Sequence, residues 1–167
     1  KTLRSFSREV PADAADPRNT PQPANTTNAQ PVGKLNALIK GFKGSGTEHD
    51  PLLIDTVENL VDLARPEVGQ KGYHFKQTED LDCGAMTSWP EIHFKGHYHG
   101  NKKSIQFREG AKFFVKIYES SISHLILRNG ILANEAEKSN ITACETNTSL
   151  IGKAKDCNMH HCNTNIY

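Results

Sequence analysis

A change to alternating apolar and polar residues after Gly72 constrains the fold more than any other feature of the sequence. Segments with this period-two pattern recur as far as Leu127, and short links rich in Gly and Asn separate them. Alternation is typical of strands that bury one face, and short links are typical of antiparallel hairpins. The pattern predicts strands at residues 73–76, 90–99, 103–108, 112–118 and 121–127.

Helical spacing precedes these strands. Asp50 is a candidate N-cap, Pro51 suits the first helical position, and apolar residues repeat at helical spacing as far as Arg65. A shorter helix is expected at residues 34–42, and a helical turn at 131–138. Helices followed by closely linked strands predict an α+β fold, in which one or two N-terminal helices pack on a four- to five-stranded antiparallel sheet. No internal repeat is recognised.

The segment at residues 1–32 differs in composition from the rest of the chain. It holds five of the eight prolines, and Phe6 is its one aromatic residue. Such a segment cannot bury enough apolar surface to offset the entropy that ordering costs. We therefore expect a disordered tail or pro-segment at residues 1–32 and a single domain at residues 33–167.

The chain has four cysteines, an even number that is typical of small secreted domains stapled by disulfides. Of the three possible pairings, the favoured one closes a short loop from Cys157 to Cys162 and a long loop from Cys83 to Cys144. The short loop also contains two histidines, which makes a zinc site an alternative. Closed zinc sites, however, usually draw on two ligand pairs that lie far apart in the sequence.

Three Asn-x-Ser/Thr sequons, at Asn25, Asn140 and Asn147, indicate the same compartment as the disulfides. Together they predict a secreted, extracellular glycoprotein. No apolar run approaches the roughly 18 residues of a membrane-spanning helix, so no membrane span is expected. The net charge of +1 excludes a strong global attraction to nucleic acid or to anionic membrane.

Residues 90–99 carry the candidate functional groups, in the order Pro-Glu-Ile-His-Phe-Lys-Gly-His-Tyr-His. Alternate side chains of a strand point to opposite faces. The apolar set is therefore expected in the core. The ionisable set is expected on the other face: Glu91, His93, Lys95, His97 and His99. His124, on a later expected strand, is interpreted as a core histidine.

A hairpin at residues 100–101 would bring a later basic residue beside this strand. A base, an acid and a cation could then cleave a phosphodiester by proton transfer and charge stabilisation, without a cofactor. The candidate catalytic residues are Glu91, His93, His97 and Arg108. The candidate binding residues are Lys95, His99 and Lys103.

In outline, this layout resembles the small secreted microbial ribonucleases, which also set a helix against an antiparallel sheet with Glu, Arg and His on its exposed face. The resemblance covers at most residues 50–128, and it implies a metal-independent endoribonuclease. Most candidate groups here lie on one strand, whereas those enzymes spread theirs over several.

Two other interpretations of the ionisable stripe are open. A half-exposed strand alternates in any case, so the stripe also fits an ordinary solvated face. Histidines two residues apart can share a metal ion, and the metal alternative uses His93, His97 and His99. The sequence shows no phosphate-binding loop, zinc-protease helix or nucleophile elbow.

We therefore expect a small secreted effector- or toxin-like protein that binds a protein of another organism and has no enzymatic activity. A secreted ribonuclease acting on RNA and a secreted metal-binding protein are the alternatives. An open sheet face suits a binding role. A protein-binding surface should also show an apolar or aromatic patch outside the core.

Overall fold

The computed structural model describes residues 39–164. The chain divides into two compact units, Lys1–Lys40 and Gly41–Tyr167, and the helices and strands described below lie in the second. The tail expected at residues 1–32 lies outside the described residues, as does most of the helix expected at 34–42. Residues 39–41 form a turn.

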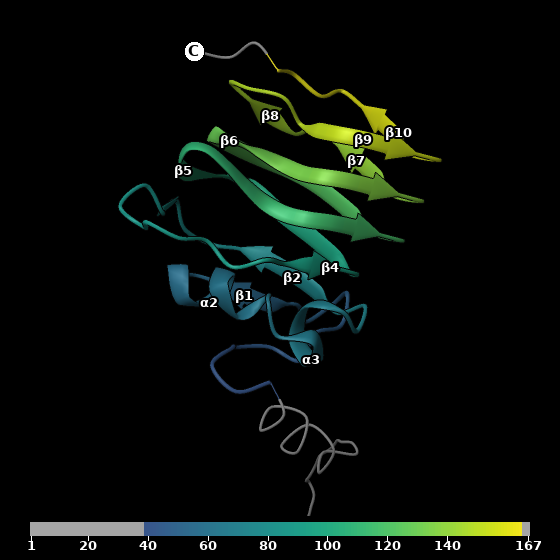
Figure 1. Cartoon of the computed structure of the whole chain (residues 1–167). Helices are drawn as coiled ribbons and strands as arrows, with labels where there is room; N and C mark the ends of the chain where they lie inside the picture. Colours follow the sequence, from purple (N-terminus) through teal and green to yellow (C-terminus); the bar gives the residue numbers. More distant parts are fainter. Residues whose placement is uncertain (1–38, 165–167) are drawn as a thin grey trace, which may run out of the picture. The chain divides into compact units, whose positions relative to one another are not determined.

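Stacked parallel strands build the second unit (Figure 1). Among the described residues, every pairing between named strands is parallel. The strands are β1 (Leu52–Ile54), β2 (His74–Gln77), β3 (Leu81–Asp82), β4 (His93–Phe94), β5 (His97–Tyr118), β6 (Ser121–Glu137), β7 (Asn140–Thr142), β8 (Glu145–Thr146), β9 (Ile151–Lys155) and β10 (Asn158–His160). The helices are α2 (Val57–Asp62) and α3 (Pro66–Gly69). The unit is a β-solenoid, in which each coil of the chain lies on the one before it.

β5 and β6 show how one coil is built. The start of β5 pairs with β2, its middle with β3 and its end with β4, while β6 pairs with β5 along its length. Register shifts between His99 and Lys103, and between Gln106 and Ala111, divide β5 into three segments. One coil therefore has three sides, and the chain turns a corner between them.

The coils shorten toward the C-terminal end. In the first two steps along one side, His74 pairs with His97, and His97 pairs with Ser121. The next two steps, from Ser121 to Asn140 and from Asn140 to Asn158, each span a visibly shorter stretch of the sequence. The chain thus contains a structural repeat that the sequence prediction missed, because the length of the repeat changes from coil to coil.

Residues with positive φ stand at the corners. Asn101, His124, Ala143 and His161 have φ values of 55–57°, and each lies just after the first segment of its coil. The left-handed backbone region changes the direction of a strand sharply at one residue. At these positions the chain turns onto the next side of the coil and does not fold back on itself.

Apolar residues stack in ladders inside the solenoid. The ladder behind the first side of the coils consists of Leu52, Phe75, Tyr98, Ile122 and Ile141. Each of these is at most 1% exposed. The Tyr98 hydroxyl donates a 2.8 Å hydrogen bond to Gln77 Oε1, so this buried polar group is satisfied. The ladder determines the outer surface, because the residues before and after each ladder residue must point outward.

α2 begins later than predicted. Its N-cap is Thr56, whose hydroxyl accepts from the Asn59 N–H while the Asn59 side chain accepts from the Thr56 N–H. The start of the expected helix forms β1, which pairs with β2 and buries Leu52 and Ile54 completely. Strand pairing and burial at this position outweigh a helical spacing that is only a weak preference.

The predicted α+β fold with an antiparallel sheet is wrong. The alternation does indicate strands, but the short links between the expected strands are corners of the solenoid. At residues 109–110 and 128–130 the chain continues within β5 and β6 and does not reverse its direction. Parallel strands need a connection of about a dozen residues or more, which a full coil supplies. The likeness to microbial ribonucleases rested on the antiparallel sheet and is lost with it. The helical turn expected at residues 131–138 belongs to β6, apart from its last residue.

The predicted disulfides are also absent, since all four cysteines are free thiols. Cys157 and Cys162 stand at opposite ends of the extended β10, so they do not close a local loop. Cys83 follows β3 and Cys144 precedes β8, with the coils of β5 and β6 between them. Burial raises the pKa of Cys83 to about 11 and that of Cys144 to about 12, which keeps both thiols protonated at neutral pH.

Candidate functional site

The predicted ionisable stripe is divided by a corner of the solenoid. His93 belongs to β4, whereas His97 and His99 belong to the first segment of β5. Gly96 lies at the corner between them, where an added Cβ would come within 2.7 Å of the Tyr73 carbonyl oxygen. The structure therefore brings His97 and His99 together on one side of the solenoid, and it places Glu91 and His93 outside that surface.

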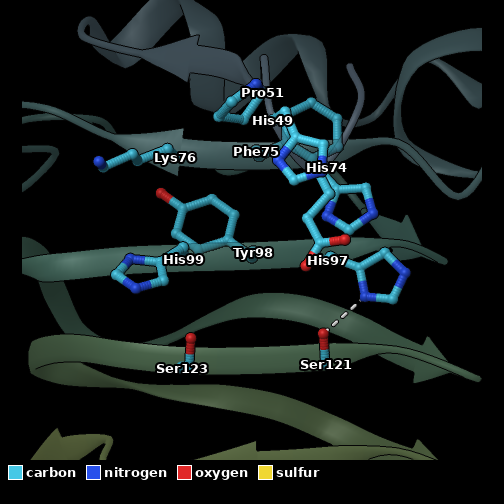
Figure 2. A pocket seen from close by; sticks show the side chains of 11 residues that line it. His49, Pro51, His74, Phe75, Lys76, His97, Tyr98, His99, Ser121 and Ser123 are labelled. Atoms are coloured by element: carbon cyan, nitrogen blue, oxygen red, sulfur yellow. Dashed lines mark hydrogen bonds between the residues drawn. The ribbon is translucent and has the colours of Figure 1, made fainter.

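Neighbouring coils complete the surface around His97 and His99. β2 lies on one side of these histidines and β6 on the other. The outward residues in register with them are His74, Lys76, Ser121 and Ser123. With the segment before β1 they line a groove of about 710 Å³ (Figure 2). We call this surface the histidine face, and it consists of Glu48, His49, His74, Lys76, His97, His99, Ser121 and Ser123.

His97 is held by contacts to both neighbouring coils. Its ring stacks on that of His74, with 4.1 Å between the centroids and 16° between the planes. Its Nδ1 is hydrogen-bonded to Ser121 Oγ at 2.7 Å, as the dashed line in Figure 2 shows. These contacts fix the orientation of the His97 ring, so its remaining edge is presented to the groove in a defined position.

His99 forms a second stacked pair. It stacks on His124 of β6 at 4.9 Å and 13°. His124 occupies a corner with φ 55°, and its Nδ1 is buried without a hydrogen-bond partner among the described residues. The interpretation of His124 as a satisfied core histidine is not confirmed, because it lies part-exposed at a corner beside the histidine face.

Both stacked pairs disfavour the protonated form of histidine. The pKa of His97 is lowered by burial and then by the neighbouring His74, while Glu48 acts in the opposite direction. The pKa of His99 is lowered by burial, by His124 and by Lys76. Desolvation and nearby positive charge both penalise an imidazolium. At neutral pH, the rings of His97 and His99 are therefore uncharged.

Two rows of polar side chains continue beyond the groove along the solenoid. The first row is His74, His97, Ser121, Asn140 and Asn158, and the second is Lys76, His99, Ser123, Thr142 and His160. Neighbouring members of a row lie one strand apart, about 4.8 Å, and the two rows are separated by roughly 7 Å along each strand. The result is a regular array of hydrogen-bonding groups that crosses five coils.

The other candidate residues lie apart from this array. Arg108 is exposed in the stretch of β5 between the register shift points and is not in register with His97. Lys103 pairs with Leu125 in the second segment of the coil. Lys95 forms a 3.0 Å ion pair with Glu119. The arrangement of Glu91, His93, His97 and Arg108 that acid–base cleavage of RNA would need is not assembled.

A second charged surface lies on the side of the solenoid that carries β4 and the ends of β5 and β6. Lys95 pairs with Glu119 at 3.0 Å and Lys116 with Glu137 at 3.3 Å. The ammonium groups of Lys95, Lys116 and Lys138 each lie 5.8–5.9 Å from the ring centroid of Tyr118. We call this surface the paired face: Lys95, Lys116, Tyr118, Glu119, Glu137 and Lys138.

The strands of the histidine face supply no backbone oxyanion hole. Ser121 and His97 are close enough to act as nucleophile and base. Acyl transfer also needs hydrogen-bond donors, often a pair of backbone N–H groups, aimed at the developing oxyanion. The backbone N–H groups of β2, β5 and β6 point along the sheet to the adjacent strands, so these strands offer no such pair to the groove.

No metal centre is assembled among residues 39–164, where no three His, Cys, Asp or Glu side chains are placed to hold an ion. His93 stands on a different segment from His97 and His99, so the three histidines of the predicted alternative do not converge. The Cys157 and Cys162 thiols approach the carbonyl oxygens of Lys155 and His160, which are main-chain contacts of a solenoid corner.

The two described sequons differ in accessibility. Asn140 is exposed on the first polar row, and its Oδ1 accepts from Asn158 Nδ2 at 3.1 Å. Asn147 is part-buried: its Oδ1 accepts from the Asn129 N–H at 2.8 Å, and its Nδ2 donates to Asn129 Oδ1 at 3.2 Å. A glycan on Asn147 would compete with these bonds. Asn25 lies outside the described residues.

Comparison with known proteins finds no match to any protein-family model, to any curated protein or to any solved structure. Neither of the helices described is long and apolar enough to cross a lipid bilayer.

Proposed function

We propose that this protein is a non-catalytic binding protein that holds an extended glycan chain on the histidine face and on the polar rows that continue it. The observation that carries the proposal is the register of those rows, which repeats imidazole, hydroxyl and amide groups over five coils. A ligand that matches such an array is itself a chain of repeating units rich in hydrogen-bonding groups. Glycans have this character.

The side-chain types on the rows support a hydroxyl-rich ligand. Serine, threonine and asparagine side chains both donate and accept hydrogen bonds, and so does neutral histidine. Ser123 and Lys76 both line the groove, where they add a hydroxyl and an ammonium group. Because the backbone of a stacked sheet is rigid, little conformational entropy is lost when these groups bind a ligand.

The surface favours a glycan over the protein partner that the sequence suggests. Binding sites for proteins are built around buried aromatic and aliphatic anchors. Among residues 39–164, the one large hydrophobic side chain with substantial exposure is Met159, at 42%. The ladder residues Phe75 and Tyr98 border the groove but are 1% exposed. The histidine face therefore offers a protein partner no apolar anchor.

Single-stranded RNA also fits the surface less well. Proteins that bind single strands combine a basic track with exposed aromatic rings on which bases stack. The groove has one lysine, Lys76, and its aromatic carbon rings are buried. The net charge of +1 gives no compensating field.

A steric variant tests the proposal. Ser123→Tyr places a large side chain in the groove while leaving the ladder residue Ile122 in place. Glu135→Tyr is the matched control, because Glu135 is exposed and lies on another side of the same strand β6. Binding is measured by isothermal titration with soluble dextran, dextran sulfate and a polyuronate, each at about pH 5 and about pH 7.5 so that histidine is sampled in both charge states.

We expect at least one of these glycans to bind. We also expect Ser123→Tyr to weaken its binding about tenfold or more, a loss of roughly 1.4 kcal/mol, while Glu135→Tyr leaves it unchanged. Absence of binding to all three glycans at both pH values would refute the proposal. An equal loss in both variants would place the binding surface elsewhere.

A further inference from the structure

We propose that the glycan held by the histidine face is a polyanion, carrying sulfate or carboxylate groups, and that it is bound in mildly acidic solution and released near neutrality. This inference rests on the proposed function and adds to it the charge of the ligand and the condition for binding. It is drawn from the number of imidazoles gathered on one surface and from the scarcity of carboxylates beside them.

The groups that face these imidazoles come from three parts of the fold. The segment before β1 contributes Glu48 and His49, and β2 contributes His74 and Lys76. β6 contributes the uncharged Ser121 and Ser123 and, behind His99, the stacked His124. Among the residues that line the groove, Glu48 is the only carboxylate and Lys76 the only permanent cation.

Near neutrality, Lys76 and Glu48 balance each other, and the pKa values of His97 and His99 are lowered, first by burial and then by the neighbouring His74 and His124. In acid, His97 and His99 gain protons on a surface that also gathers the imidazoles of His49, His74 and His124. The groove then changes from nearly neutral to cationic without any movement of the chain. Two parallel rows of donors present this charge at the spacing of the strands.

The stacked pairs couple protonation to the ligand. Two imidazolium rings with centroids 4.1 Å apart, as in His74 and His97, repel each other. An anionic group lying over the pair offsets that repulsion, so its binding raises the affinity of the pair for protons. Linkage is reciprocal, and protons must therefore raise the affinity for the anion by the same factor. A neutral glycan does not offset the repulsion between the rings, so its affinity is not coupled to protonation in this way.

The paired face shows why the effect belongs to one surface. Its Lys95 and Lys116 are already paired with Glu119 and Glu137, and its defined residues include no histidine. His93 is the histidine at the border of that surface, in the hollow with Lys95, Lys116 and Tyr118. It serves as a control that removes one histidine without touching the histidine face.

The test compares dextran sulfate with dextran, which share one backbone and differ in charge. Affinities are measured by isothermal titration at about pH 5 and about pH 7.5, on either side of the ordinary pKa of histidine, and at one ionic strength. Dextran sulfate should bind about tenfold or more tightly at the lower pH, with net proton uptake when the titration is repeated in buffers of different ionisation enthalpy. Dextran should show no pH dependence. The full chain is used throughout.

Two variants of the histidine face assign the effect, and His93→Gln is their control. His97→Gln with His99→Gln should remove most of the pH dependence, whereas His93→Gln should leave it unchanged. Glu48→Gln lies on an exposed segment and leaves the core untouched. It should strengthen dextran sulfate binding near neutrality, because it removes the one opposing charge. This second variant keeps the test decisive if the double variant fails to fold.

The outcomes separate this inference from the proposed function. In one contrary outcome, dextran and dextran sulfate bind with equal affinity at both pH values, and Ser123→Tyr still blocks their binding. That result would overturn the inference that the ligand is a polyanion and would leave the glycan-binding function standing. No binding of any glycan would overturn both. Binding of poly(U) RNA with the same affinity and pH profile as dextran sulfate would overturn the assignment to a glycan and indicate recognition of charge alone.

Discussion

The histidine face and the paired face both draw residues from the strands β5 and β6, yet their charged groups are arranged in opposite ways. On the paired face, lysine and glutamate side chains from successive coils neutralise each other at 3.0 and 3.3 Å. On the histidine face and at the corner beside it, imidazoles from successive coils stack on one another at 4.1 and 4.9 Å. A solenoid determines the spacing of its surface groups, and the side chains alone decide whether that spacing gives ion pairs or stacked imidazoles.

The largest expected effect tests whether the two faces rest on an equally rigid core. Tyr98 lies behind the histidine face, and Phe114 lies inside the coil near the paired face; both are at most 1% exposed. Removing either ring leaves a large cavity, so Tyr98→Ala and Phe114→Ala should each lower the free energy of unfolding by about 3–5 kcal/mol. Urea denaturation followed by circular dichroism measures this. A loss of stability in only one of the two variants would show that the core behind one face is less important for stability than the core behind the other.

A smaller effect is expected at the corner that joins the two faces. The Ser120 hydroxyl is within hydrogen-bonding distance of the Phe94 and Tyr118 carbonyl oxygens and accepts from the Gly96 N–H. Ser120→Ala leaves these buried groups without a partner and should cost about 1–3 kcal/mol. Ser123→Ala, on the exposed side of the same strand, is the control and should change stability little. Equal stability of both variants would mean that the corner does not depend on this hydroxyl.

The pH dependence of stability should come from the histidine face. The folded pKa values of His97 and His99 lie below the unfolded value, so the unfolded chain binds more protons in acid. The contribution of these two histidines to stability is therefore fully present above about pH 6.5, their pKa in the unfolded chain. It is lost as the pH falls from that value toward their lower pKa values in the folded chain. Thermal unfolding from about pH 7.5 to about pH 5 measures this. His97→Gln with His99→Gln should flatten the profile, and a profile that stays unchanged would contradict the assignment.

The smallest effect should come from the paired face. Glu119→Gln removes an ion pair with Lys95 in which both side chains are nearly half exposed. Exposed pairs contribute about 0–1 kcal/mol and are screened by salt. Urea denaturation at low and high salt should show a difference from the native chain only at low salt. A loss of several kcal/mol would mean that the pair is part of a cooperative network.

The local pattern around residues 97–99 could be predicted from the sequence alone. The alternation of histidine with a buried Tyr98 gives both the strand and the outward direction of His97 and His99. His93 could not be separated from them in this way, because nothing in a period-two pattern reveals a corner at Gly96. The same pattern describes a hairpin and a solenoid corner, and hairpins are the more familiar outcome of short Gly- and Asn-containing links.

The rest of the candidate site comes from other coils. His74 and Ser121 are each separated from His97 by a full coil of the chain, and the parallel register alone places them on either side of it. One signal could have suggested that register. The run Cys-Glu-Thr-Asn at residues 144–147 recurs as Cys-Asn-Thr-Asn at residues 162–165, with the same spacing as the partners Asn140 and Asn158 across the last coil.

The sequence by itself determined which residues alternate between core and surface, because burial of apolar side chains at every second position is a property of the local chain. The tertiary structure alone decided that the strands are parallel, that the cysteines do not meet in the predicted pairs and that four distant histidines line one groove. These outcomes depend on the register between coils, which is set by the stacking of ladders such as Phe75, Tyr98 and Ile122. No local pattern contains that register, because each rung of a ladder is supplied by a different part of the chain.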